Sequence, residues 1–315
     1  MYNFDMRKGL ILYNPIAGKF SSPNAVKRAA SVLRQNNWEI EILPTESAEH
    51  LTQTARESAE TGADALFVAG GDGSMQDAAK GLSGSETALG VLPAGTVNVL
   101  AHELGFPSLS WLRPNALSYA ARKLADGILR PIDVGYCNEV PFLLWIGIGF
   151  DAYIVHMMEK QRKRWHRQFP YIRYTLAIFG YGPRWKGFRA RLTTNGNTTT
   201  DRYVMFVGAN IRTYGGRAVQ LSPDAKIGDG MMEGWAFHSE PITLPRIVGL
   251  IWSAFRQQHL TSNNIRLYPF TQIDMQSDSP MYIHLDGDPF PLTKQISIRV
   301  QHNGIKLLVP KDLHL

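Results

Sequence analysis

A glycine-rich string, Gly70-Gly71-Asp72-Gly73-Ser74, follows an apolar run at residues 65–69 and precedes a helical pattern at residues 75–82. Glycines let a backbone approach a phosphate closely, and the amides at the start of a helix attract anions. A carboxylate in such a loop either acts through bound Mg²⁺ or accepts hydrogen bonds that keep the loop in shape. Taken alone, a string of this kind is more often a tight turn.

Two other polar, glycine-bearing turns follow apolar runs nearby in the chain. Asn14-Pro15-Ile16-Ala17-Gly18-Lys19 follows residues 9–13, and Pro93-Ala94-Gly95-Thr96-Val97-Asn98 follows residues 89–92. Parallel sheets bind ligands outside the carboxyl ends of their strands. Three such turns at one edge predict a nucleotide crevice, and the set is a stronger indication than any member.

These turns must be positioned by strands and helices that alternate over the first 130 residues. The pattern predicts strands at 9–13, 38–43, 65–69 and 89–92, and helices at 23–33, 47–62, 75–82, 98–104 and 114–126. Ser47 is expected to cap the second helix. Alternation of this kind indicates βαβ units and a parallel sheet covered on both faces.

The pattern changes to strand-like runs after about residue 132. These lie at 133–137, 141–148, 188–194, 203–209, 234–237, 265–275, 281–285, 296–301 and 305–309. Asn195-Gly196 and Asn303-Gly304 are typical hairpin turns, and helical inserts are expected near 151–159, 170–179 and 242–258. We therefore expect a nucleotide-binding α/β domain at 1–131, an antiparallel β-sandwich domain at 132–300, and a segment at 301–315 that can return to the first domain.

Composition bounds the cellular setting. The chain has 315 residues, 44% of them hydrophobic and 19% charged, which is ordinary globular usage. The single cysteine, Cys137, excludes an intrachain disulfide framework and a cysteine-based zinc cage, and it favours a reducing compartment such as the cytoplasm. We find no apolar run of about 18 residues that could span a membrane and no secretion signal.

The net charge of 33 minus 27, or +6, is unevenly distributed. Residues 160–191 hold ten Lys or Arg and no acid, interleaved with aromatic residues. An anionic membrane surface suits that mixture, and the candidate contacts are Arg162, Lys163, Arg164, Trp165 and Arg167. A solvated basic face with its aromatic residues in the core is about equally favoured. Nucleic acid ranks lower, because no zinc-finger or RNP-like motif is present.

Eight short strings in order along nearly the whole chain resemble the diacylglycerol kinase catalytic-domain family, which includes bacterial lipid kinases, sphingosine kinases and ceramide kinases. The strings are those at 14–19, 70–74 and 92–98, then Pro131 to Gly135, Gly147 to Ala152, Tyr214 to Gly216, Ser222 to Gly230, and Asp286-Gly287-Asp288. We expect the chain to resemble the soluble bacterial branch most, because the sequence shows no pattern of a regulatory domain.

The resemblance implies a Rossmann-like domain that binds ATP, followed by a β-sandwich of the NAD kinase and diacylglycerol kinase type. Carried over by position, the nucleotide contacts are Asn14, Lys19, Thr45, Gly70, Gly71, Asp72, Gly73, Ser74, Met75, Gln76 and Thr96. A structural Mg²⁺ maps to Lys226, Asp229 and Met231, the first and last through backbone carbonyls. Spacing alone would instead favour a simple hairpin turn at Asp229-Gly230.

The resemblance also implies that Asp288 is the general base and that Asp72 takes part in catalysis beside the Mg²⁺ on the phosphates. The family's base lies in an Asp-Gly-Glu string, so Asp288 is a departure: its carboxylate is shorter by one methylene, about 1.5 Å. Ser74, Gln76, Asp77 and Val99 also differ from the usual residues, and Val99 removes a carboxylate.

Together these features predict a lipid kinase that uses ATP and Mg²⁺. The acceptor could be a diacylglycerol-like lipid, phosphatidylglycerol or a sphingoid base, and the sequence does not distinguish them. We expect a cytoplasmic protein with peripheral contact to anionic membrane and no nucleic-acid partner; a homodimer through strand edges stays open. The alternatives are a soluble-substrate kinase of the NAD kinase type and a non-catalytic lipid- or nucleotide-binding protein.

Overall fold

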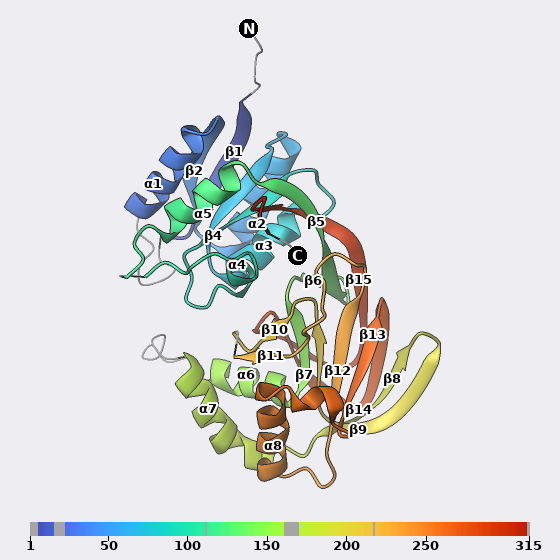
Figure 1. Ribbon diagram of the computed structural model, residues 1–315. Helices are drawn as coiled ribbons and strands as arrows, with labels where there is room; N and C mark the ends of the chain where they lie inside the picture. The colour runs from blue at the N-terminus through green and yellow to red at the C-terminus, as the bar shows by residue number, and fades with distance from the viewer. Residues whose placement is uncertain (1–5, 16–22, 111, 161–169, 217, 314–315) are drawn as a thin grey trace. The chain divides into compact units, whose positions relative to one another are not determined.

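The computed structural model describes residues 6–15, 23–110, 112–160, 170–216 and 218–313, which form two compact units (Figure 1). The first unit comprises residues 1–134 and 302–315, and the second comprises residues 135–301. The chain passes from the first unit to the second within β5 (Ile128–Cys137) and returns within β15 (Asp288–Val309). Each unit has its own hydrophobic core.

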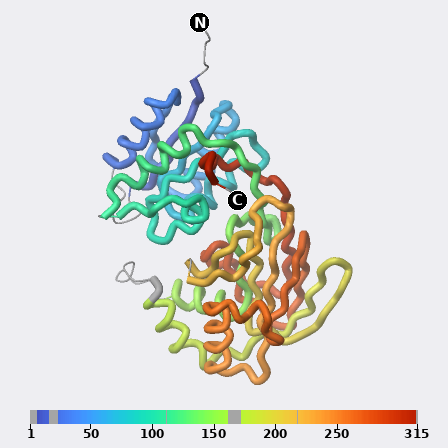
Figure 2. Tube along the Cα trace, in the orientation of Figure 1, coloured from blue at the N-terminus to red at the C-terminus, as the bar shows by residue number. Residues whose placement is uncertain are grey.

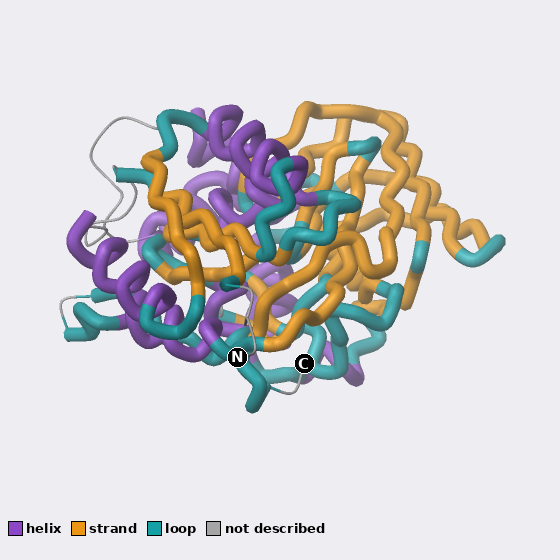
Figure 3. The backbone as a smooth tube through the Cα atoms, turned by 90° about the horizontal axis from the view of Figure 1, so that it is seen from above, coloured by secondary structure: helices purple, strands orange, loops and turns teal. Residues whose placement is uncertain are grey.

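The first unit is a parallel sheet with helices on both faces, as the alternating pattern predicts. Its other elements are β1 (Arg7–Tyr13), α1 (Pro23–Arg34), β2 (Trp38–Pro44), α2 (Ala48–Glu60), β3 (Ala65–Gly70), α3 (Asp72–Leu82), β4 (Ala88–Pro93), α4 (Val99–Glu103) and α5 (Ala116–Ala125). The strand order is β15-β4-β3-β1-β2. Helix α1 packs against α5, and α2 packs against α3; Figure 3 shows these helices in purple on either side of the strands. Every residue of β3 and β4 is buried, which explains their uninterrupted apolar runs.

The second unit is an antiparallel β-sandwich with helical inserts. Its remaining elements are β6 (Val140–Phe142), β7 (Trp145–Gly149), α6 (Phe150–Lys160), α7 (Pro170–Tyr181), the 3₁₀ turn η1 (Gly182–Arg184), β8 (Phe188–Thr194), β9 (Asn197–Ala209), β10 (Thr213–Tyr214), β11 (Val219–Gln220), β12 (Met232–His238), α8 (Leu244–Phe255), η2 (Gln258–Thr261), β13 (Ile265–Phe270) and β14 (Gln272–Leu285). The strand order is β13-β12-β9-β7-β14-β15, and β8 pairs with both β9 and β14. The long strands β9 and β14 therefore belong to both layers, and Figure 2 traces their course.

Two hairpins of this unit are closed by two-residue turns in which both residues have positive φ. Asn195 and Gly196 have φ values of 50° and 75° and join β8 to β9, as the Asn-Gly signal predicts. Asp286 and Gly287 have φ values of 51° and 96° and join β14 to β15. The second turn likewise has a polar residue followed by glycine, but no hairpin is predicted there from the sequence.

The expected hairpin at Asn303-Gly304 is wrong, because β15 runs through it without reversing. Its last residues pair in parallel with β4, Lys306 opposite Ala88, and so complete the sheet of the first unit. Asp133 explains the local geometry: its carboxylate is fully buried, and Oδ1 lies 2.9 Å from His302 Nδ1 and accepts the Asn303 amide at 3.0 Å. The positive φ of Asn303, 55°, serves this contact rather than a chain reversal.

Among the described residues, no helix is long and apolar enough to cross a bilayer.

Candidate functional site

The glycine-rich loop and the turn after β4 pack directly on each other in the first unit. The Gly70 carbonyl accepts hydrogen bonds from the amides of Ala94 at 3.0 Å and Gly95 at 3.1 Å. A Cβ placed on Gly95 would lie 2.4 Å from the Gly71 Cα, so no other residue fits there without moving the backbone. The close approach of two backbones, rather than a special φ, therefore explains Gly95, whereas a Cβ on Gly71 would lie 3.3 Å from the Gly95 Cα.

Asn98, at the end of the second turn, is itself in the left-handed conformation, with φ 54°. Its side-chain oxygen accepts the Gly95 amide at 2.9 Å, and its amide nitrogen donates to the Gly95 carbonyl and to Ser108 Oγ, both at 2.9 Å. The side chain is buried, and each of its polar ends has a partner. Asn98 thus shapes the turn from within instead of facing a ligand.

Asp72, the first residue of α3, joins the loop to α4. Its Oδ1 accepts the Leu100 amide at 3.1 Å. Burial raises the pKa of this carboxyl, and hydrogen bonds from backbone amides, that of Val99 first, oppose the rise. The sequence left a metal-binding and a loop-shaping role open for Asp72, and this oxygen is used for loop shaping.

The other nucleotide candidates lie at the same edge of the sheet, because β1 to β4 are parallel and end beside one another. Thr45 follows β2, and its hydroxyl donates to the Tyr13 carbonyl at the end of β1, at 3.3 Å. Thr96 is exposed, whereas Met75 and Gln76 are buried in α3. Asn14 lies at the end of β1, and Lys19 lies outside the described residues.

The second unit presents Asp288 at the start of β15, directly after the Asp286-Gly287 turn. Asp288 is exposed, whereas Asp286 is half-buried. The Asp286 carboxylate anchors the turn, because it accepts hydrogen bonds from three backbone amides: Leu143 at 2.8 Å, Leu144 at 2.8 Å and Trp145 at 2.9 Å. Of the two acids in the string, Asp288 is therefore the one presented toward solvent.

These three hydrogen bonds also explain why the predicted strand at 141–148 is two strands. Leu143 and Leu144 lie in the gap between β6 and β7, where their amides point to Asp286 rather than to a neighbouring strand. Sequence reasoning missed this role. The signal that could have found it is the Asp-Gly pair between two apolar runs, which favours a tight hairpin turn.

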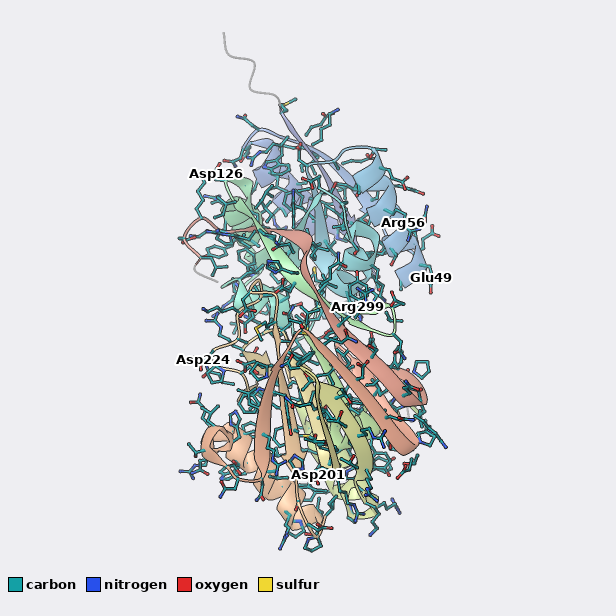
Figure 4. The ribbon with its side chains drawn as sticks, turned by 90° about the vertical axis from the view of Figure 1, so that its right-hand side faces the viewer. Glu49, Arg56, Asp126, Asp201, Asp224 and Arg299 are labelled. Atoms are coloured by element: carbon teal, nitrogen blue, oxygen red, sulfur yellow. The ribbon has the colours of Figure 1, made fainter. Side chains whose placement is uncertain are left out.

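The proposed metal residues lie on the segment that connects β11 to β12. Lys226, Asp229 and Met231 are all exposed, and the Met231 amide donates to Asp229 Oδ1 at 3.1 Å. Burial raises the pKa of the neighbouring Glu233, and the charges of Asp224 (labelled in Figure 4) and Asp229 add to that rise. Among the described residues no group of three His, Cys, Asp or Glu side chains could hold a metal, so a cation here would need carbonyl ligands as well.

The five candidate membrane contacts, Arg162, Lys163, Arg164, Trp165 and Arg167, lie outside the described residues.

Comparison with known proteins adds independent evidence. Residues 8–137 match the model of the diacylglycerol kinase catalytic domain, and residues 145–309 match that of the YegS C-terminal NAD kinase beta sandwich-like domain. A diacylglycerol kinase of Bacillus subtilis is 24% identical over 285 residues, which covers 90% of each chain. A diacylglycerol kinase of Mycobacterium tuberculosis is 28% identical over 305 residues, which covers 93% of each.

The fold comparison agrees. The crystal structure of a diacylglycerol kinase from Bacillus anthracis superposes on all of this chain with a TM-score of 0.72 at 19% identity, and all of that chain is covered. This shows that the two share a fold. Because the two family models together span both units, and the second alone covers residues 145–309, this chain belongs to the diacylglycerol kinase catalytic-domain family.

Proposed function

We propose that the protein is a lipid kinase that transfers the γ-phosphoryl group of ATP to a lipid hydroxyl. The observation that carries the proposal is the contact of Gly71 with Gly95 at the carboxyl edge of the sheet. It places backbone without side chains beside the start of α3, whose N-cap residue Gly71 makes no side-chain cap. Backbone of this kind suits phosphate oxygens.

Asn14, Thr45 and Thr96, at the ends of three strands of that edge, are the polar side chains proposed to hold the rest of the nucleotide. Mg²⁺, when bound to the nucleotide, neutralises charge on the phosphates. The residues present fit a cation in two places. The Asp72 carboxylate lies at the start of α3, beside the contact of Gly71 with Gly95. The exposed Asp229 carboxylate lies near Glu233, whose pKa is raised by burial and then by the charges of Asp224 and Asp229. Carbonyls of Lys226 and Met231 would complete the second site.

Asp288 is proposed to act as general base on the acceptor. Its carboxylate takes the proton of the lipid hydroxyl while that oxygen forms a bond to the γ-phosphorus. The bond from the γ-phosphorus to the oxygen of the β-phosphate breaks, and ADP leaves with the electron pair. Positioning and charge stabilisation supply most of the rate in such a transfer, and the base contributes about 10² to 10⁴.

The acceptor would reach the second unit from a bilayer surface. Helix α7 exposes Ile172, Leu176 and Phe179 by 58%, 66% and 57%, and their i, i+4, i+7 spacing puts them on one face. Trp252 and Phe255 are exposed on α8. Arg173 and Arg184 lie on or next to α7, and residues 160–191 contain no acid. Exposed aromatic and aliphatic side chains flanked by cationic residues suit an anionic bilayer.

The test is transfer of labelled γ-phosphate from ATP with Mg²⁺ to diacylglycerol, phosphatidylglycerol and a sphingoid base in mixed micelles, with NAD and no-lipid controls. We expect one labelled lipid, and Asp288→Asn should lower kcat by about 10² to 10⁴ while ATP still binds. Asp288→Glu tells whether the shorter carboxylate is an adaptation or a loss. Label in NAD would overturn the proposal, and so would ATP binding without transfer to any acceptor.

A further inference from the structure

A buried carboxylate and a buried imidazole lie next to each other in the second unit, in β14 and α6. His284 is 2% and Asp151 is 7% exposed, and Nε2 of the histidine lies 2.6 Å from Oδ2 of the aspartate. Tyr174 of α7 donates its phenol to Oδ1, and Tyr214 of β10 donates to Oδ2. Three side chains from β14, α7 and β10 thus converge on the Asp151 carboxylate of α6.

The charges of this cluster follow from its burial and its contacts. Burial acts to raise the pKa of Asp151, but His284 and the two phenols outweigh it and hold that pKa below its usual value. Burial, together with the charge of Asp151, raises the pKa values of Tyr174 and Tyr214 well above the usual one. Asp151 is therefore an anion that accepts hydrogen bonds from the imidazole and the two phenols.

The second ring nitrogen of His284 points to the turn that carries the candidate base. Its Nδ1 accepts the backbone amide of Gly287 at 3.2 Å. An accepting Nδ1 carries no hydrogen, so the proton resides on Nε2 and is donated to Asp151. The contact series Asp151–His284–Gly287 therefore runs from a buried anion to the residue immediately before Asp288.

Packing reserves space for this histidine. His284 pairs with Gly147 of β7, and a Cβ on that glycine would lie 2.2 Å from the imidazole Nε2. A buried polar cluster contributes little net stability compared with apolar residues of the same volume. Keeping one beneath an exposed turn is thus better explained by positioning than by stability.

We propose that His284 and Asp151, supported by Tyr174 and Tyr214, position the Asp286–Asp288 turn so that the Asp288 carboxylate meets the acceptor hydroxyl. The inference rests on the proposed kinase function. The turn is then held on two sides: the Asp286 carboxylate by the amides of residues 143–145, and the Gly287 amide by His284. His284 and Asp151 are positioning residues, since they act through Asp288.

Two substitutions of His284 distinguish the effect of its hydrogen bond to Asp151 from that of its hydrogen bond to Gly287. In His284→Asn the amide oxygen can replace Nδ1 and still accept from Gly287, whereas the bond to Asp151 is lost. In His284→Gln the amide nitrogen can replace Nε2 and still donate to Asp151, whereas the acceptor for Gly287 is lost. Both remove the same ring from the same cavity, so each is the control for the other.

If the pair positions Asp288, His284→Gln should lower kcat by about 10- to 100-fold, with the KM for ATP unchanged, and His284→Asn should lose clearly less. In an Asp288→Asn background, His284→Gln should cost almost nothing more, because its effect passes through Asp288. An equal loss in both backgrounds, or wild-type kcat in folded His284→Gln, would overturn the proposal. If His284→Gln does not fold, Tyr214→Phe replaces it, and it should show the same non-additivity with Asp288→Asn.

Hydrogen exchange gives a readout that does not depend on activity. The Gly287 amide should exchange faster in His284→Gln than in His284→Asn, and equal exchange rates would refute the bond on which the proposal is built. A wild-type protein that transfers to no acceptor, but shows the expected difference in exchange, would overturn the kinase function and leave the hydrogen-bond series intact.

Discussion

The Asp72 carboxylate accepts the Leu100 amide at 3.1 Å, so the first residue of α3 is tied to the start of α4. The bond joins the glycine-rich loop to the turn after β4 through a group that burial makes costly to ionise. The ionised Asp72 carboxylate thus fixes the shape of the loop but lowers the free energy of unfolding, and the dependence of that free energy on pH can be measured.

Asp72→Asn should change how stability depends on pH. Burial raises the folded-state pKa of Asp72 above its usual value of 3.8, so the ionised carboxylate subtracts stability at pH values above the folded pKa. That cost vanishes as the pH falls through the folded pKa toward 3.8. Urea unfolding at a series of pH values should show wild type gaining stability relative to Asp72→Asn as the pH falls. A gain in the opposite direction would contradict the burial of this carboxylate.

Gly95→Ala should push the turn after β4 away from the glycine-rich loop. The new methyl would lie 2.4 Å from the Gly71 Cα, and backbone must move to admit it. We expect a loss of about 1 to 3 kcal/mol in the free energy of unfolding, together with weaker ATP binding by calorimetry. Gly249→Ala on α8 is the control, because no atom lies within 4 Å of its added Cβ. If both variants bind ATP like wild type, the glycine contact is not part of the nucleotide site.

Asp286→Asn should destabilise the second unit. Asparagine tolerates the positive φ of 51°, but it has one acceptor oxygen where the carboxylate has two for three amides. The loss should be about 1.5 to 3 kcal/mol, the value of a hydrogen bond to a charged group. Asn195→Asp, in the other two-residue turn, makes the reverse exchange. It removes only one long, exposed hydrogen bond, from Asn195 Nδ2 to the Pro269 carbonyl at 3.3 Å, and should lower stability by less than about 1 kcal/mol. Equal effects in denaturant melts would refute the anchoring role.

Leu176→Ser and Phe179→Ser should weaken binding to vesicles that contain phosphatidylglycerol. Each removes an exposed apolar side chain whose burial in a bilayer is worth about 1.5 to 3 kcal/mol, so partitioning should fall about tenfold or more. Leu267→Ser is the control, because Leu267 is also an exposed apolar residue, at 43%, but lies on β13. Arg173→Gln should weaken binding only at low salt. Vesicle sedimentation that is the same for all four variants would make the α7 face an ordinary solvated surface.

Local patterns were sufficient for the strand edge that carries the nucleotide candidates. Apolar runs that end in glycine-bearing turns, separated by helices, allow little besides a parallel sheet, and a parallel sheet places those turns together. The Asn195-Gly196 hairpin is confirmed for the same reason, because both residues accept positive φ. Asn303-Gly304 is the same dipeptide, yet it lies within a continuous strand, since the buried Asp133 carboxylate accepts a hydrogen bond from the Asn303 amide.

The sequence by itself determined the family, the two kinds of fold and the residues from which a nucleotide loop and a candidate base are built, because each is carried by a short string or a local period. Only the tertiary structure decided which acid of the Asp286-Gly287-Asp288 string is an anchor and which is presented. It also joined Asp151 to His284, which no local pattern could do, because they lie 133 residues apart in the chain. A hydrogen bond at such a separation depends on the packing of the whole unit.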